Sequence, residues 1–166
     1  MAAKGCETVK RMKTVVDQVI RGVSSVLVIL LVTGALWQVF SRYVLNDPSI
    51  VTEELLRFGL IWTTMLGASY AFGTNQHLAL TFIRNKLKGK PAQTVRMVND
   101  LGILCFAAVI MVKGGIEIVS QTMAQLSPML QWPMGIVYSI LPISGALIIY
   151  YQLLNIAEWF KIKKDA

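Results

Sequence analysis

The sequence predicts an all-α integral membrane protein with four transmembrane helices, short amphipathic interfacial helices and both termini in the cytoplasm. Of its 166 residues, 55% are hydrophobic and only 15% are charged, whereas soluble domains usually carry about 25% charged residues. The apolar residues are grouped in four runs, and each run reaches the roughly 20 residues that cross a bilayer. We expect a single membrane domain over residues 1–166, with spans at about 23–43, 55–83, 98–123 and 130–158.

The basic residues predict the orientation of these spans. Thirteen of the 16 lie before the first run, between the second and third, or after the fourth. Short loops rich in Lys and Arg stay in the cytoplasm, so both termini are expected there. The net charge of +7 is then explained by topology and by contact with lipid head groups of the bilayer, and nucleic acid is not an expected partner.

The segment before the first span has apolar residues at three- and four-residue steps. This pattern predicts either an amphipathic helix on the inner surface that runs into the first span, or a cytoplasmic extension of the same helix. The pattern is formed by Val9, Met12, Val16, Ile20 and Val23.

Two prolines predict local features of the later helices. Asp47 and Pro48 are a typical helix start, with Asp47 as the N-cap and Pro48 at the first helical position. Pro142, in the middle of the fourth run, predicts a local bend.

Two adjacent carboxylates, Glu53 and Glu54, open the second span. Neighbouring helical residues project about 100° apart, so these two do not suit an acid/base pair. Glu53 lies four residues before Arg57 and Glu54 three, which favours ion pairing. With Arg42 at the end of the first span, they predict a structural clasp or a docking point for a partner, with chemistry as the lesser alternative.

Lys113 and Glu117 interrupt the third apolar run near its middle. Ionisable residues at that depth are functional candidates. Their four-residue spacing predicts an intramembrane ion pair that faces inward or toward another subunit, with a proton or ion relay as the alternative. Along the second span, a stripe of small residues predicts close helix packing, within this chain or with another: Gly59, Thr63, Gly67 and Ala71.

No residue pattern predicts catalysis, a metal site or a cofactor. His77 is the single histidine, and one histidine cannot supply the pair that holds haem between membrane helices. Cys6 and Cys105 are expected to be inert thiols. Phosphate-binding loops, metal-ligand spacings and a nucleophile elbow are absent from the sequence, so we do not expect an enzyme.

The segment Trp37–Leu80 resembles the core signature of the small membrane subunit (DctQ-like) of tripartite ATP-independent periplasmic, or TRAP, transporters. The matching elements occur in order along the segment: Gln38-Val39, Ser41-Arg42-Tyr43, Glu53-Glu54-Leu55 with Arg57, Trp62, Gly67-Ala68 and the approach to His77. One departure follows the histidine. Family members often continue as His-x-Arg-Val-Asp, whereas His77 here is followed by the uncharged residues 78–81, so this chain lacks the charges of that pattern.

The resemblance implies a non-catalytic subunit of a sodium-coupled transporter in the bacterial inner membrane. It implies two protein partners: a large multi-span membrane subunit, which this chain scaffolds, and a periplasmic substrate-binding protein, which it helps to dock. The cargo would be an organic acid of the sialic acid or C4-dicarboxylate type, and sialic-acid members look most similar. The alternative function is a stand-alone four-helix proton-coupled exporter, which needs an unpaired membrane carboxylate. A haem or quinone anchor would need histidines from a partner.

Overall fold

The computed structural model describes residues 2–47, 49–73 and 90–165. These residues are helical almost throughout and contain no β-strand, only an isolated bridge between Leu126 and Pro133. This confirms the predicted all-α class. The helices are α1 (Ala2–Tyr43), α2 (Ile50–Gly73), α4 (Lys90–Phe106), the π-helix η1 (Ala107–Gly114), α5 (Gly115–Thr122), α6 (Met134–Tyr138) and α7 (Ile140–Asp165).

Three stretches of the described residues are long and apolar enough to cross a membrane. They are Lys13–Tyr43, Met97–Thr122 and Met134–Ile156. The stretch Met97–Thr122 belongs to a helix that runs without a break from α4 through η1 to α5, and we call these three elements the third rod. The described part of α2 is not among the segments that are long and apolar enough to cross a membrane. Residues 74–83, which complete the predicted second span, lie outside the described residues.

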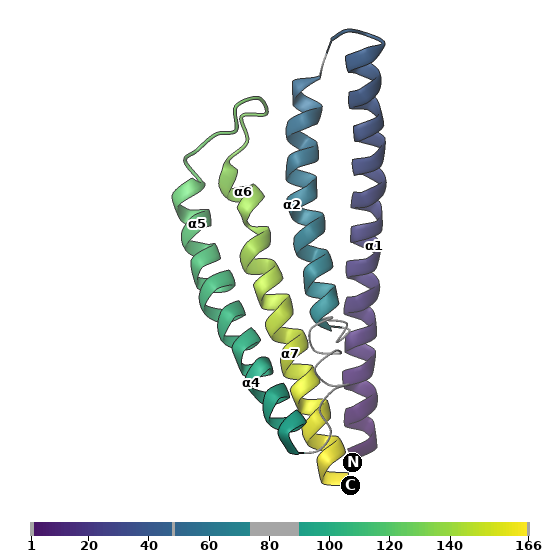
Figure 1. Cartoon of the computed structure of the whole chain (residues 1–166), viewed down its shortest axis with the longest axis vertical. Helices are drawn as coiled ribbons and strands as arrows, with labels where there is room; N and C mark the ends of the chain where they lie inside the picture. Colours follow the sequence, from purple (N-terminus) through teal and green to yellow (C-terminus); the bar gives the residue numbers. More distant parts are fainter. Residues whose placement is uncertain (1, 48, 74–89, 166) are drawn as a thin grey trace.

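The helices stand side by side in an open row (Figure 1). α2 packs between α1 and α7, and α7 packs on the third rod; α1 makes no comparable contact with the rod. The order across the row is therefore α1, α2, α7 and the third rod. α1 begins and α7 ends at the same end of the molecule (Figure 1). The opposite end, which carries the turn at 44–49 and the connection at 123–133, is called the turn end below.

α1 is one unbroken helix of 42 residues. Of the two arrangements predicted for the segment before the first span, the structure therefore has the extension of the same helix, and a separate interfacial helix is not present among residues 2–43. The extension packs through Ile20, which belongs to a buried cluster with Leu66, Ile140 and Tyr151. This cluster joins α1, α2 and α7.

The predicted start of α2 at Asp47 is wrong, because the helix begins at Ile50. The Ser49 carbonyl accepts the first helical hydrogen bond, from the Glu53 N–H at 3.3 Å, so Ser49 occupies the N-cap position. Asp47 instead closes the preceding turn, since its N–H donates to the Ser41 carbonyl at 3.2 Å. Pro48 lies outside the described residues.

The fourth apolar run is interrupted before the predicted bend. α6 ends at Tyr138 and α7 begins at Ile140. Pro142 explains the position, because a proline has no N–H to donate to the carbonyl four residues earlier, which here belongs to Tyr138. The helix therefore breaks at Ser139, whose N–H donates to the Ile136 carbonyl at 3.3 Å. Residues 130–133, predicted to be helical, form part of the connection.

Small residues do bring the helices together, although the predicted stripe on α2 serves this purpose only in part. A side chain at Gly59 would come within 2.8 Å of Leu31 on α1, whereas Gly67 is exposed and has open space beside it. Thr63 and Ala71 are half-buried. The α7–rod packing relies on glycines outside the stripe: a Cβ at Gly115 would lie 2.9 Å from Pro142, and one at Gly145 would lie 2.8 Å from Met111.

Candidate functional site

Glu54 joins α2 to the connection between α5 and α6. Its Oε2 accepts hydrogen bonds from the backbone N–H groups of Met129 at 3.2 Å and Leu130 at 2.9 Å. Consecutive amides that converge on one carboxylate form a favourable anion site. Glu54 was expected to face Arg57, but in the structure it holds a segment about 75 residues away in the sequence.

The connection is shaped to present these two amides. The Ser127 N–H donates to the Trp132 carbonyl at 2.9 Å, and the Met134 N–H donates to the Gln125 carbonyl at 2.8 Å. Gln131 has a left-handed backbone, with φ of 54°, and its side-chain amide donates to the Ser127 and Pro128 carbonyls. The result is a compact turn that Glu54 fastens to α2.

The other three residues of the predicted clasp are exposed at the turn end. Glu53 and Arg57 form an ion pair at 3.5 Å, with side chains that are 50% and 71% exposed. Such surface pairs contribute about 0–1 kcal/mol. Arg42 is also exposed and makes no ion pair with any carboxylate in the described part of the chain. Glu54 alone of the four therefore connects two elements of this chain.

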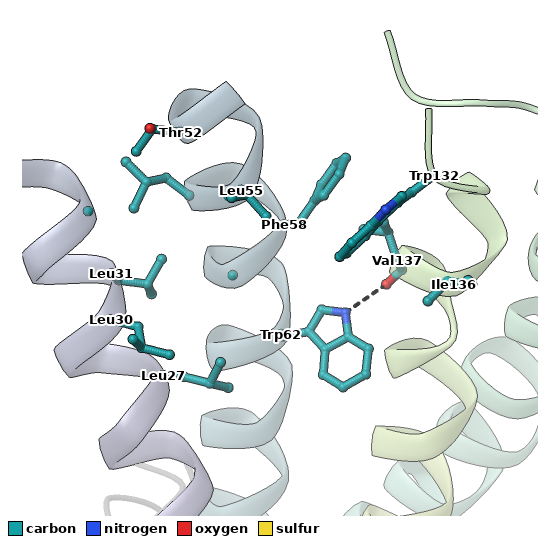
Figure 2. A pocket seen from close by; sticks show the side chains of 13 residues that line it. Leu27, Leu30, Leu31, Thr52, Leu55, Phe58, Trp62, Trp132, Ile136 and Val137 are labelled. Carbon is teal, nitrogen blue, oxygen red and sulfur yellow. Dashed lines mark hydrogen bonds between the residues drawn. The ribbon is translucent and has the colours of Figure 1, made fainter. Parts of the chain in front are cut away.

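An apolar groove of about 440 Å³ lies beside this cluster, between α1, α2 and α6 (Figure 2). Figure 2 shows the Trp62 indole N–H donating to the Val137 carbonyl, at 3.1 Å, which joins α2 to α6. The lining side chains are apolar except for the Thr52 hydroxyl and two indoles. The lining residues are Leu27, Leu30, Leu31, Gly34, Thr52, Leu55, Leu56, Phe58, Gly59, Trp62, Trp132, Ile136 and Val137.

This lining suits apolar groups and does not suit an organic acid. A buried carboxylate requires charged or hydrogen-bonding partners, and the groove offers no charged side chain. The Trp62 N–H is already engaged. The groove can therefore accept a lipid chain or apolar side chains of a partner.

A second polar cluster, which the sequence did not reveal, holds α1 to α7 near the end with the termini. The Tyr151 hydroxyl donates to Asp17, and the Lys13 ammonium donates to the side chain of Asn155 at 3.1 Å. The Arg21 guanidinium lies 5.8 Å from the centre of the Tyr70 ring on α2. The sequence feature that could have indicated this cluster is Asp17, because it is the single acidic residue between Lys13 and Arg21 in a basic segment.

Lys113 and Glu117 are both exposed on the third rod. Among the residues described, no ion pair within 4.0 Å joins them. The neutralisation expected within one helix is therefore absent from this chain. His77 lies outside the described residues, and Cys105 is an exposed free thiol.

Comparison with known proteins gives the class of this molecule. The family described as "Tripartite ATP-independent periplasmic transporters, DctQ component" matches residues 11–162. The chain belongs to the DctQ family.

Two curated relatives of this DctQ protein are named as small permease proteins. The chain is 24% identical, over 92% of its length and 88% of the relative's, to "Sialic acid TRAP transporter small permease protein SiaQ" of Vibrio cholerae serotype O1. It is 30% identical, over 64% of its length and 66% of the relative's, to "Putative TRAP transporter small permease protein" of Haemophilus influenzae.

Membership of the DctQ family establishes the general role of the chain. DctQ proteins are small permease subunits of TRAP transporters, and they are transport components, not enzymes. They work with a large membrane subunit and a binding protein in a tripartite system. The apolar helices agree with a place in a membrane.

Proposed function

We propose that this DctQ protein is the non-catalytic scaffold of a sodium-coupled TRAP transporter in the bacterial inner membrane. It supports a large membrane subunit that carries the transport path, and its turn end faces the periplasmic binding protein. The observation that carries this proposal is the open row of helices, because a row one helix thick encloses no path of its own.

The burial of the helices supports the scaffold role. Only 6% of the apolar window in Lys13–Tyr43 is buried, compared with 17% in Met97–Thr122 and 39% in Met134–Ile156. The two ends of the row, α1 and the third rod, thus leave most of their apolar surface to lipid or to a partner. Large exposed apolar surfaces of this kind mark membrane or protein contacts.

Four crossings with both termini in the cytoplasm are part of the proposal. α1 begins and α7 ends at one end of the molecule (Figure 1), as an even number of crossings requires. The basic residues before residue 22 and after residue 160 favour the cytoplasm for that end. The second crossing begins with α2, and the rest of the predicted span 55–83 lies outside the described residues.

The turn end is the proposed contact for the binding protein. Arg42, Glu53 and Arg57 are exposed there, and Glu54 keeps the neighbouring connection in place. Exposed charges on a rigid surface favour transient binding of a second protein that is guided by electrostatic attraction. The name of the Vibrio cholerae relative supports a cargo of the sialic acid type, and a C4-dicarboxylate type acid is the second choice.

The test is reconstitution into liposomes with each component omitted in turn. The chain, a large TRAP membrane subunit of the same organism and its binding protein are combined, and uptake of labelled sialic acid is followed under an inward sodium gradient. We expect uptake with all three components and none when any one is left out. Gradient-driven uptake by this chain alone would favour the stand-alone exporter and end the scaffold proposal.

A further inference from the structure

Two opposite charges lie within the apolar part of the third rod. Lys113 and Glu117 precede Thr122, the last residue of α5, by nine and five residues, which is roughly 13 and 7 Å along a helix. Their neighbours Val109, Ile110 and Ile116 are 55%, 59% and 57% exposed. Lys113 is therefore surrounded by surface that suits hydrocarbon, and Glu117 follows directly after the exposed Ile116.

Neither charge has an ionic partner in the described part of the chain. Ionisable side chains at this depth are costly, and almost always face the interior of a bundle or pair with other groups. Lys113 and Glu117 do not face the interior of this chain, because both are exposed. The described residues therefore supply neither charge with a partner, and the exposed side of the rod is open to a second membrane subunit.

The π-helix arranges these charges in a line. In an α-helix, residues four apart drift by about 40° around the axis, so three such steps drift by about 120°. In a π-helix the hydrogen bonds close over five residues, so a turn holds more than four residues. A four-residue step then falls short of a full turn, and the drift inside Ala107–Gly114 runs back against the drift of the flanking α-helices. Cys105, Val109, Lys113 and Glu117 are all exposed, as expected for residues on one side of the rod.

The opposite side of the rod is occupied by α7. Ala107 is fully buried, and Gly115 and Met111 pack closely on Pro142 and Gly145. The side of the rod that carries Lys113 and Glu117 therefore faces away from the other helices, at the free end of the row. A helix added there would extend the row.

We propose that this line is the surface on which the large membrane subunit docks. The docking helix of that subunit carries an acidic side chain opposite Lys113 and a basic or hydrogen-bond-donating side chain opposite Glu117. The inference rests on the proposed scaffold role and names the surface that performs it. It also accounts for the π-helix, since that element keeps both charges on the free side.

A charge exchange tests the proposal. The double substitution Lys113→Glu and Glu117→Lys preserves composition, spacing and any attraction between the two side chains, but reverses both charges toward a partner. We expect retention of the large subunit on the tagged chain to fall at least about tenfold, because close interfacial charge pairs contribute strongly to binding. Unchanged retention would overturn the proposal.

Photo-crosslinking locates the surface independently of charge. A benzophenone amino acid at Val109 tests the proposed line, and one at Ile29, which is 64% exposed on α1, is a matched control at the other end of the row. We expect an adduct with the large subunit from position 109 and none from position 29. An adduct from position 29 alone would overturn the assigned surface.

These outcomes separate this inference from the proposed function. If the unaltered chain retains the large subunit but the exchange and position 109 have no effect, the docking surface is wrong and the scaffold role stands. If the unaltered chain does not retain the large subunit, the scaffold role itself fails. Equal membrane levels and equal elution of the exchanged and unaltered chains in detergent exclude misfolding as the cause.

Discussion

Adjacent residues in this chain have different roles because a helix separates them by about 100°. Glu54 reaches the amides of Met129 and Leu130, while Glu53 forms an exposed pair with Arg57. The sequence predicted that the two carboxylates do not act together. It could not predict that Glu54 fastens the distant connection, since the groups it binds are backbone amides, which carry no pattern in the sequence.

Replacing Glu54 should destabilise the fold more than replacing Glu53. Glu54→Ala removes the acceptor of two amides, and a lost acceptor of this kind costs about 1–3 kcal/mol. Glu53→Ala removes half of an exposed pair and should stay within about 0.5 kcal/mol. Denaturant unfolding in detergent micelles measures both, and equal effects would refute the fastening role of Glu54.

Two adjacent tyrosines on α7 offer a matched pair of substitutions. Tyr151→Phe removes the hydroxyl that donates to Asp17 and leaves that carboxylate without its donor, so we expect a loss of about 1–2 kcal/mol. Tyr150→Phe removes a buried hydroxyl that has no hydrogen-bond partner among the described residues, so stability should stay the same or rise. Thermal unfolding in detergent decides between them, and the reverse order would contradict the assigned hydrogen bond.

At the scale of elements, the sequence predicted the helical runs but not their irregularities. It placed the helix start at Asp47 and the bend at Pro142, whereas α2 begins at Ile50 and the break lies at Ser139. The π-helix had no signal in the apolar pattern. The close contacts between α7 and the third rod involve Gly115 and Gly145, which form no regular stripe. A single sequence does not reveal which residues on another helix face them.

The packing of α7 on the third rod predicts a large difference between two glycine substitutions. A side chain at Gly145 would lie 2.8 Å from the Met111 Cβ and 3.3 Å from its backbone carbon, whereas one at Gly102 meets nothing within 4 Å. Gly145→Val should lower stability by about 1–3 kcal/mol through overpacking, and Gly102→Val should have little effect. Thermal unfolding of both variants provides the check, and similar losses would contradict the described packing.

At the scale of the molecule, the apolar content and the basic residues predicted a membrane protein, and the resemblance carried by Trp37–Leu80 indicated the transporter family. They could not predict the open row, because the order of helices across a layer depends on pairwise contacts that apolar runs do not encode. The row matters for function, since it leaves α1 and the third rod available to a partner. It also makes a transport path within this chain alone difficult to build.

Labelling in intact cells tests the proposed orientation of the row. In a background with Cys6 and Cys105 replaced by Ser, Asn46→Cys at the turn end should react with a membrane-impermeant maleimide from the periplasm. Lys164→Cys should react only after the membrane is opened. Reaction of Lys164→Cys in intact cells would contradict cytoplasmic termini.

The central claim is that this chain supports a transport path that lies in another subunit. The most direct measurement is a titration in liposomes, in which the large subunit and binding protein are held constant and the amount of this chain is varied. Sodium-driven uptake of sialic acid should rise from zero and then reach a plateau when every large subunit is occupied. Uptake that grows with the amount of this chain without a limit, or that continues without the large subunit, would contradict the claim.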